Sequence, residues 1–384
     1  MTREETAKKL LATADIRING NRPWDMRINN PKTYQRVLAE GSIGLGESYM
    51  DGWWDCDRLD IFFEKLISVD LERVVRGNWI YLRDAALAKV INLQSPKRAF
   101  EVGEKHYDNG NDLYALMLDP RMVYTCAYWE GLKEVPQNLA KAQEQKLDLV
   151  CKKLGLKKGM KVLEIGCGWG SFMKFAAEKY GVSVVGYTIS KEQVELGKKM
   201  CKGLPVEFKL EDYRNAKKSG EQFDRIVSLG MFEHVGYKNY REYMEVAHTC
   251  LKSGGLFLLH TIGNKVSQKI VDPWTNKYIF PNGHLPSVSQ ITFAAEGLFD
   301  LEDFHSFGRD YAPTCMAWNY NFIKNWDKIK KIAKENGEPR YNDRFFRMWT
   351  YWLQMSAGSF TSKFNKLWQV VFSKDRKEDY VGVR

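Results

Sequence analysis

Residues 161–170 read Lys-Val-Leu-Glu-Ile-Gly-Cys-Gly-Trp-Gly, a short apolar run that ends in closely spaced glycines. Such a run, bounded by glycines, predicts a buried strand over 161–165. The next ten residues, 171–180, predict a helix, with Ser171 near its start and Gly181 just beyond its end. Glycines between a strand and a helix allow the backbone to turn tightly and to approach a ligand closely.

The same alternation continues toward the carboxyl end of the chain. We predict further strands over 182–187, 206–210, 223–228, 256–261 and 367–373, and helices over 191–201 and 238–251. Strands that alternate with helices predict right-handed crossovers and a parallel sheet, in which ligands bind at the carboxyl ends of the strands. The predicted fold class is therefore α/β, with a Rossmann-like sheet.

The amino-terminal part of the chain has a different texture. Residues 1–90 predict a small, mostly helical domain, and turn residues around Ser95 and Pro96 predict a linker over 91–105, so that the α/β domain spans 106–384. The first residues are charged, and we expect no signal peptide. No apolar run approaches the roughly 18 residues of a spanning helix, so any contact with a membrane is expected at its surface.

The glycine stretch indicates which ligand the sheet binds. Its G-x-G-x-G spacing differs from the G-x-G-x-x-G dinucleotide fingerprint, and it lacks the Gly-Lys-Ser/Thr of a phosphate-binding loop. Glu164 precedes the glycines directly and suits a cationic ligand, such as the ammonium group of S-adenosylmethionine. The alternative is an ordinary tight turn. The acid, the glycines and the strand together favour S-adenosylmethionine.

The end of the second predicted strand lacks the acid that many methyltransferases use to bind the ribose. No acidic residue follows Tyr187 until Glu192, so Thr188, Ser190 and Gln193 are the candidates for hydrogen bonds there. Asp212 and Tyr213 follow the third predicted strand and are candidates for the edge and face of the adenine.

Charge and cysteine content narrow the class of partner and the compartment. The net charge of +10 implies an anionic partner, either nucleic acid or acidic lipid, unless the protein is simply a basic one without such a partner. The seven cysteines are scattered without a CxxC pair, which predicts neither disulfides nor a cysteine zinc site and fits the cytosol. We expect no metal, although His106, Asp108 and Asp112 superficially resemble a ligand cluster.

Residues 72–98 hold six basic residues against two acids, with apolar residues at roughly helical spacing. This pattern is typical of a basic amphipathic helix at a membrane surface, although a helix packed on its own domain would show it too. We therefore expect an anionic phospholipid surface as the partner, with the protein in the cytoplasm and peripherally associated with the inner face of the membrane.

Several motifs, in this order, resemble the cyclopropane fatty acid synthases. They lie at 106–114, 124–129, 164–170, 230–236, 258–263, 272–283 and 308–311. The resemblance covers nearly the whole chain, including an N-terminal domain that the shorter mycolic acid cyclopropane synthases lack. It implies a class I S-adenosylmethionine-dependent methyltransferase fold, a two-domain bacterial enzyme that acts on phospholipids, and a homodimer.

The resemblance also implies roles for individual residues. Those expected at S-adenosylmethionine are Tyr124, Thr125, Glu164, Gly166, Cys167, Gly168, Gly170, Thr188, Ser190, Gln193, Asp212 and Tyr213. Those expected around a bicarbonate ion, which serves as the catalytic base, are Cys126, Glu233, His260, Ile262 and Tyr311. Ser356 stands where some members carry a cysteine near the reaction centre, which puts a catalytic role for that cysteine in doubt.

The chemistry explains why such residues are needed. The alkene attacks the sulfonium methyl, a carbocation forms on the acyl chain, and a proton then leaves the transferred methyl so that the ring closes. The pocket must exclude water, stabilise the cation with aromatic faces and place a base at the methyl. Aromatic candidates are Tyr124, Tyr128, Trp129, Phe232, Tyr311 and Trp318, with Tyr278 and Phe280 as possible walls of an acyl channel; ordinary core packing is the alternative for each.

Three other functions remain open at this point. One is a related methyltransferase that makes a methyl-branched or hydroxylated chain, or that methylates an amine. Another is a lipid-binding protein on a methyltransferase scaffold without catalysis. A nucleic-acid methyltransferase fits the charge, but the sequence contains no Asn-Pro-Pro-Tyr or Pro-Cys target-base motif, so we expect no nucleic-acid partner.

Overall fold

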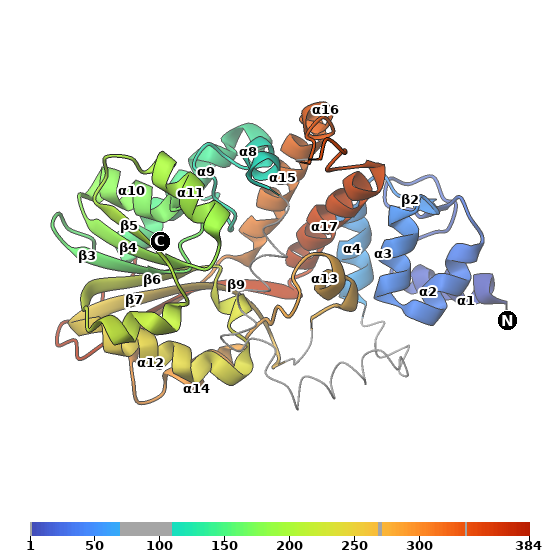
Figure 1. The fold of residues 1–384 in the computed structure, drawn as a ribbon. Coiled ribbons are helices and arrows are strands. Elements are labelled where there is room, and N and C mark those ends of the chain that lie inside the picture. Colours follow the sequence, from blue (N-terminus) through green and yellow to red (C-terminus); the bar gives the residue numbers. More distant parts are fainter. Residues whose placement is uncertain (1, 70–109, 268–270, 335) are drawn as a thin grey trace. The chain divides into compact units, whose positions relative to one another are not determined.

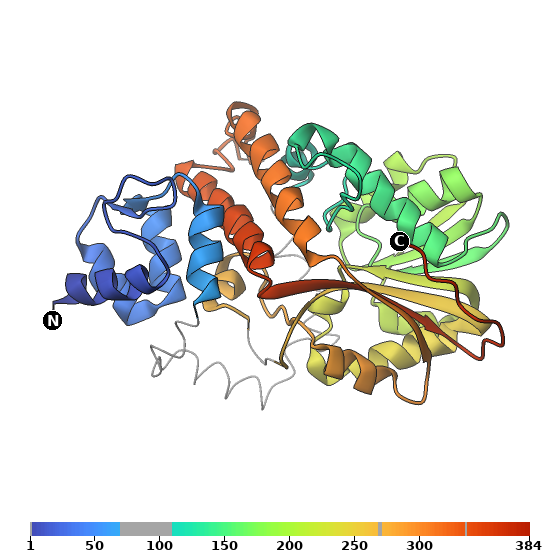
Figure 2. The ribbon, with the colours of Figure 1, turned by 180° about the vertical axis from the view of Figure 1, so that it is seen from behind.

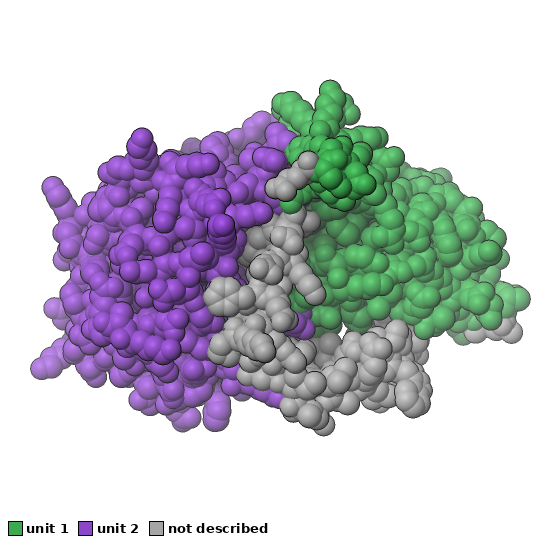
Figure 3. Space-filling model, viewed as in Figure 1, with its two compact units in different colours: residues 1–91, 270–281, 311–365 green, residues 92–269, 282–310, 366–384 purple. Residues whose placement is uncertain are grey.

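The computed structural model describes residues 2–69, 110–267, 271–334 and 336–384. Two compact units can be distinguished (Figures 1 and 3). The first unit comprises Met1–Ile91, Ile270–Pro281 and Tyr311–Asn365, and the second comprises Asn92–Lys269, Asn282–Asp310 and Lys366–Arg384. The predicted basic helix at 72–98, the linker at 91–105 and the start of the 106–114 motif lie outside the described residues.

The second unit is built on a seven-stranded sheet with the order β5-β4-β3-β6-β7-β9-β8. Its strands are β3 (Lys161–Ile165), β4 (Ser183–Thr188), β5 (Val206–Leu210), β6 (Phe223–Leu229), β7 (Leu251–Asn264), β8 (Asp300–Ser306) and β9 (Asn365–Ser373). The strands from β3 to β7 pair in parallel, as the alternation predicts, and helices alternate with them as expected for a Rossmann-like α/β sheet. The predicted parallel pairing does not extend to the whole sheet, because β8 pairs with β9 antiparallel.

Helices cover both faces of this sheet, as Figures 1 and 2 show. Successive residues of β3 explain why: Val162 packs in one apolar core with α9 (Leu139–Lys153) and α10 (Ser171–Tyr180), and Leu163 in another with α12 (Tyr240–Cys250) and α14 (Val288–Ala295). A strand buried on both sides reads as a continuous apolar run. The unit also contains α8 (Asn111–Met117), α11 (Lys191–Met200) and short 3-10 turns at 136–138, 213–219, 232–234, 237–239 and 308–310.

The first unit is mostly helical, as predicted for the amino-terminal part. Its elements are α1 (Arg3–Thr13), α2 (Lys32–Glu40), α3 (Ser42–Met50), α4 (Leu59–Ser68), α13 (Pro273–Tyr278), α15 (Tyr311–Lys324), α16 (Trp326–Ile329), α17 (Asp343–Thr361) and the short antiparallel pair β1 (Arg27–Ile28) and β2 (Trp54–Asp55). Within the described ranges, no helix is both long and apolar enough to cross a bilayer.

Two segments from the carboxyl half group with the first unit, which differs from the predicted continuous domain at 106–384. Helix α17 packs on α4 and α15. At Gly358 the approach is so close that a Cβ atom would lie 2.5 Å from the Asp60 carbonyl oxygen. Trp274 of α13 is completely buried, and its ring centroid lies 4.6 Å from that of Tyr351. These contacts join segments that lie far apart in the sequence.

Candidate active site

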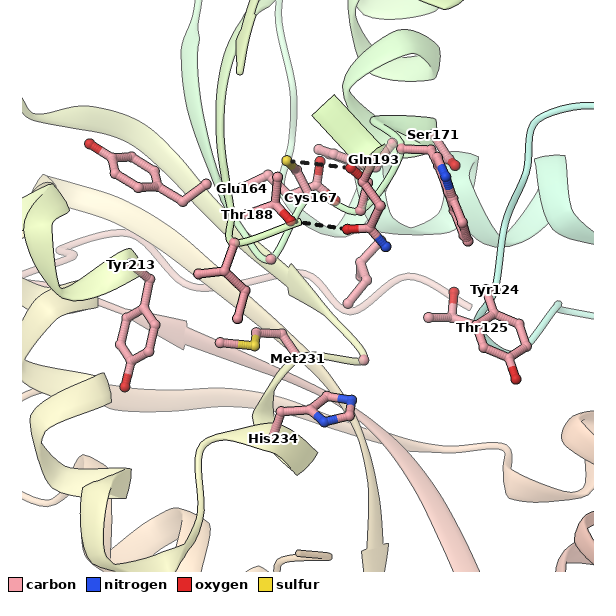
Figure 4. A pocket seen from close by; sticks show the side chains of 18 of the residues that line it. Tyr124, Thr125, Glu164, Cys167, Ser171, Thr188, Gln193, Tyr213, Met231 and His234 are labelled. Carbon is pink, nitrogen blue, oxygen red and sulfur yellow. Dashed lines mark hydrogen bonds between the residues drawn. The ribbon is translucent and has the colours of Figure 1, made fainter. Parts of the chain in front are cut away.

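A pocket lies where β3, β4, β5 and β6 end, at the carboxyl edge of the parallel strands (Figure 4). Figure 4 shows Tyr124 and Thr125 on one side of it and Tyr213 on the other. The predicted cofactor residues that line it are Tyr124, Thr125, Glu164, Gly166, Cys167, Gly168, Thr188, Gln193, Asp212 and Tyr213. Segments from four strand ends therefore meet around one cavity.

Gly170 and Ser190 do not line the pocket and support it from outside. Gly170 adopts a left-handed conformation (φ 80°) before α10, and a Cβ there would lie 2.5 Å from the ring of Phe208. Ser190 caps α11, where its hydroxyl accepts a hydrogen bond from the Gln193 amide at 3.3 Å. The glycine is therefore required by the turn and by packing, and the serine by the helix cap.

The glycine turn itself brings the backbone to the cavity. Gly166 has φ 82°, and a Cβ there would lie 2.6 Å from the side chain of Met231. Only glycine fits this position, because any side chain would be strained and would clash. Met231 lines the same pocket, so the turn closes against the end of β6.

The end of β4 offers a hydrogen-bond donor in place of an acid. The Thr188 hydroxyl donates to Gln193 Oε1 at 3.0 Å, and Gln193 Nε2 is buried without a partner in the described part of the chain. Asp212 is already engaged, because its carboxylate accepts from the Arg214 amide and pairs with the Arg214 guanidinium, both at 2.9 Å. The Tyr213 hydroxyl is buried and has no partner among the described residues.

Glu164 and Lys146 give the pocket its internal charge. Glu164 is 3% exposed, and its Oε2 has no hydrogen-bond partner within the described ranges. Burial raises the pKa of Glu164 well above its usual value, an effect that the nearby Lys146 ammonium opposes. A buried carboxylate oxygen without a partner is costly, and a cationic group such as an ammonium would satisfy it. The residues present therefore fit S-adenosylmethionine.

The pocket is also lined by residues that the sequence analysis did not assign to the cofactor. Lys146 lies on α9, the helix before β3, and it lines the cavity, as does His234. Burial lowers the pKa of His234 to about 4, so the ring is neutral. Further lining residues that lie outside the predicted cofactor segments include Ser171, Glu211 and Met231.

Glu233 belongs to the residues expected around the base. It lies in the short turn Phe232–His234, and its Oε1 accepts a hydrogen bond from the Ile262 amide at 2.6 Å. Its Oε2 is buried and has no partner in the part of the chain that the structure describes. Burial raises the pKa of Glu233 to about 7, so the carboxyl group exchanges its proton near neutral pH.

His260 lies two residues before Ile262 on β7 and is 1% exposed. Gln369 Nε2 lies 3.3 Å from His260 Nδ1 and donates to it, so His260 Nε2 carries the ring proton. Nε2 is buried and unpartnered among the described residues. Burial, together with Lys146 and Lys153, keeps the pKa of His260 well below its usual value, so the ring is neutral. One donor and one carboxyl oxygen thus lie buried and unsatisfied at this end of β6 and β7.

The remaining predicted site residues fall in both units. Cys126 is completely buried in the second unit, directly after Thr125. Tyr311 begins α15 of the first unit, where its ring stacks on Phe360 with centroids 4.4 Å apart. Ser356 is buried in α17 of the same unit.

The predicted aromatic residues divide in the same way. Tyr128 lies 5.3 Å from Phe307, whose ring is 5.9 Å from that of His260, so Phe307 is an aromatic neighbour that the sequence did not reveal. The predicted Phe232 instead stacks on Tyr240 at 4.1 Å in a core cluster. The amide of Trp129 donates to Asp310 Oδ2 at 2.8 Å.

Besides Tyr311, three predicted aromatic residues belong to the first unit. Trp318 packs on Tyr311. The Tyr278 hydroxyl donates to Glu47 Oε1 at 2.7 Å, and Phe280 packs on Trp352. Each therefore has a packing or hydrogen-bonding role within its own unit.

None of the seven cysteines, all of which lie within the described ranges, forms a disulfide. Within the described ranges, no group of three or more His, Cys, Asp or Glu side chains is arranged to hold a metal ion.

Comparison with known proteins agrees with this geometry. The chain is 52% identical over 368 residues to the cyclopropane-fatty-acyl-phospholipid synthase of Escherichia coli K12, an alignment that covers 96% of this chain and 92% of that protein. A cyclopropane synthase from Mycobacterium tuberculosis has a similar structure, with a TM-score of 0.64 and 29% identity, over 72% of this chain and 98% of that one.

A mycolic acid cyclopropane synthase solved in complex with SAH (S-adenosylhomocysteine) and CTAB is similar as well, with a TM-score of 0.63 and 30% identity, over 72% of this chain and 98% of that one. Residues 94–370 match the family described as mycolic acid cyclopropane synthetase. The chain therefore belongs to the mycolic acid cyclopropane synthetase family of S-adenosylmethionine-dependent methyltransferases.

Proposed function

We propose that the protein transfers the methyl group of S-adenosylmethionine to the cis double bond of unsaturated phospholipid acyl chains and so forms a cyclopropane ring. The observation that carries this proposal is the pair of buried, unsatisfied polar atoms, Glu233 Oε2 and His260 Nε2, at the strand ends beside the cofactor pocket. A transfer to an amine or a hydroxyl needs no base at the transferred methyl, whereas ring closure does. The similarity to the phospholipid synthase of E. coli supports the choice of acceptor.

The side chains of the pocket suit S-adenosylmethionine, which supplies an electrophilic methyl group when bound. Glu164 Oε2 is placed to receive an ammonium, and Gln193 Nε2 is a donor beside the end of β4. Tyr128 and Phe307 exclude water next to His260. Aromatic faces stabilise a nearby cation by about 0.5–2 kcal/mol each without bonding to it, as a carbocation on the acyl chain requires.

We further propose that bicarbonate is the base, held by Glu233, His260 and the polypeptide around Cys126. When bound, this ion would accept the proton that leaves the transferred methyl. The neutral His260 ring donates from Nε2, and the Glu233 carboxyl, with a pKa of about 7, can donate or accept near neutral pH. Bicarbonate bears both a negatively charged oxygen and a hydroxyl group. Its charged oxygen can accept a hydrogen bond from His260 Nε2, and its hydroxyl can donate one to Glu233 Oε2.

Mass spectrometry of the lipid product tests the reaction. Purified protein is incubated with S-adenosylmethionine and vesicles of a cis-monounsaturated phosphatidylglycerol. We expect each modified acyl chain to gain one CH₂ and no oxygen. Ozonolysis should no longer cleave the modified chain, because its double bond has been converted to the ring. A product that contains an added oxygen would indicate a hydroxylated chain, and a retained double bond would indicate a methyl-branched one; either result would refute cyclopropane formation.

Bicarbonate is tested separately from the reaction. Turnover is measured in buffer freed of carbon dioxide and again after bicarbonate is added. We expect wild-type turnover to rise on addition, and the Glu233→Gln variant to lose this response. Full turnover without bicarbonate would refute the ion as the base and leave the reaction class intact.

We also propose that the protein acts in the cytoplasm at an anionic phospholipid surface, as a homodimer. The net charge of +10 supports the first part. Exposed lysines at the end of α15 and beyond it, close in sequence to the exposed Tyr320 and Ile323, support it as well, namely Lys324, Lys328, Lys330, Lys331 and Lys334. Each cation near an anionic surface contributes about 1 kcal/mol. Cosedimentation with phosphatidylglycerol but not phosphatidylcholine vesicles is expected, and equal binding to both would contradict it. Sedimentation velocity tests the dimer.

A further inference from the structure

Helix α9 holds one residue of the pocket, Thr125, by two side chains. Gln143 Nε2 donates to the Thr125 carbonyl oxygen at 2.8 Å, and Lys146 Nζ donates to the Thr125 hydroxyl at 2.7 Å. Gln143 and Lys146 are three residues apart on the helix, so they share a face, and both are completely buried. From another direction, Gly230 packs on Thr125, since a Cβ at Gly230 would lie 2.7 Å from the Thr125 methyl. Thr125 is therefore fixed in place.

The bond from Lys146 determines how the Thr125 hydroxyl can interact with a ligand. An ammonium group only donates hydrogen bonds, so Thr125 Oγ1 is the acceptor in this pair. The hydroxyl keeps one proton of its own to donate. Because Thr125 lines the cofactor pocket, a ligand atom that meets this hydroxyl has to be an acceptor.

Lys146 is buried, and nearby acidic groups oppose the loss of its charge. Burial lowers its pKa to about 8, against the opposing effect of Cys126, Asp119 and Glu164, so the amine is mostly protonated at neutral pH. Glu164 lines the same pocket and is the group suited to a ligand cation. The pocket thus presents a carboxylate and, separately, a hydroxyl backed by an ammonium.

We propose that Lys146 is a positioning residue that makes the Thr125 hydroxyl an obligatory donor into the pocket, where it binds the carboxylate of the amino-acid end of S-adenosylmethionine. The inference rests on the proposed binding of S-adenosylmethionine. That amino-acid end carries one ammonium and one carboxylate. The ammonium matches Glu164, and the carboxylate matches the Thr125 hydroxyl that Lys146 holds. Lys146 acts through Thr125 and need not touch the ligand.

Two ligands that differ only in the carboxylate test this assignment. S-adenosylhomocysteine and its decarboxylated analogue are titrated calorimetrically into the full-length protein and into four variants. Lys146→Met and Thr125→Val remove the ammonium and the hydroxyl, whereas Thr125→Ser keeps the hydroxyl. Lys141→Met is the matched control, because Lys141 lies exposed on the same helix.

We expect Lys146→Met and Thr125→Val each to weaken binding of S-adenosylhomocysteine by roughly 10- to 100-fold, as for the loss of a hydrogen bond to a charged group. Binding of the decarboxylated analogue should change little. Thr125→Ser, which keeps the hydroxyl, should regain most of the binding of S-adenosylhomocysteine that Thr125→Val loses. Lys141→Met should bind both ligands like the wild type, and the Lys146→Met/Thr125→Val double variant should be no weaker than the weaker single variant. If Lys146→Met fails to fold, the test rests on the difference in binding of S-adenosylhomocysteine between Thr125→Val and Thr125→Ser.

An equal loss for both ligands in Lys146→Met and Thr125→Val would overturn the proposal, since it would show a purely structural role. Undiminished binding of S-adenosylhomocysteine by Thr125→Val would overturn it too. A wild-type protein that binds neither ligand would contradict the proposed cofactor instead, so the two failures are distinguishable.

Discussion

Replacing Glu233 by Gln should change the pH dependence of stability in a direction that the structure specifies. The Glu233 carboxyl is buried, with Oε1 bonded to the Ile262 amide and Oε2 unpartnered in the described part of the chain. Its pKa is about 7 in the folded protein, against an ordinary value of 4.5. The unfolded chain therefore releases this proton at a lower pH than the folded protein does.

The sign and size of the effect follow from this difference. Because the folded-state pKa is raised, this group's contribution to stability is fully present below about pH 4.5 and is lost as the pH rises through about 7. The loss amounts to about 3 kcal/mol when it is complete. Gln cannot ionise. Going from about pH 4 to about pH 8, the stability of Glu233→Gln relative to wild type should rise by about 3 kcal/mol, whatever constant offset the new amide introduces.

Urea unfolding, followed by tryptophan fluorescence in buffer free of bicarbonate and ligand, measures this difference at several pH values. Glu195→Gln, at an exposed position on α11, is the control and should show no such rise. A difference between Glu233→Gln and wild type that is independent of pH, or that falls as the pH rises, would refute the description of Glu233 as a buried and poorly satisfied carboxyl.

Three further outcomes are expected. His260→Gln should lower turnover by roughly 10²–10⁴-fold while calorimetric binding of S-adenosylhomocysteine stays close to wild type; a matching loss of binding would contradict a role beside the base. Gly358→Ala should lower the free energy of unfolding by about 1–3 kcal/mol, because its Cβ would meet backbone atoms of α4, and an unchanged urea midpoint would argue against the α4–α17 packing. Arg347→Met should cost about 2–4 kcal/mol in the same assay, because Arg347 lies 4.0 Å from the centroid of the Tyr49 ring and bonds Asp55, whereas Arg344→Met should cost less.

The sequence predicted best the elements that are buried on both sides and bounded by glycine. Strand β3 and helix α10 begin and end where predicted, because an apolar run and glycine turns mark them directly. Strand β5 also has the predicted bounds, although it lies at an edge of the sheet and only Phe208 in it is buried. Strand β8 was missed since it is largely exposed at the edge of the sheet, and its sequence, Asp-Leu-Glu-Asp-Phe-His-Ser, shows no apolar run. The grouping of 311–365 with the first unit depends on packing between distant segments, which local patterns do not encode.

The candidate site shows the same division. Residues next to strand ends, such as Glu164 and Thr188, could be placed at the pocket because the topology brings strand ends together. Lys146 and Phe307 could not, since one projects from a helix and the other follows an edge strand, and neither has a marked sequence context. Gly170 and Ser190 lie in segments that reach the pocket, but neither residue lines it. Gly170 forms the turn before α10, and Ser190 caps α11.

The interleaved composition of the first unit has a consequence for how the chain is made. Helix α4 ends at Ser68, whereas α17, which covers it, begins only at Asp343. At about 5–20 residues per second, a ribosome needs on the order of 10–60 s to synthesise the intervening chain. During that interval Phe62 and Phe63 of α4 lack the neighbour that helps bury them in the finished protein. The nascent amino-terminal segment is therefore expected to be a client for chaperones until synthesis is nearly complete.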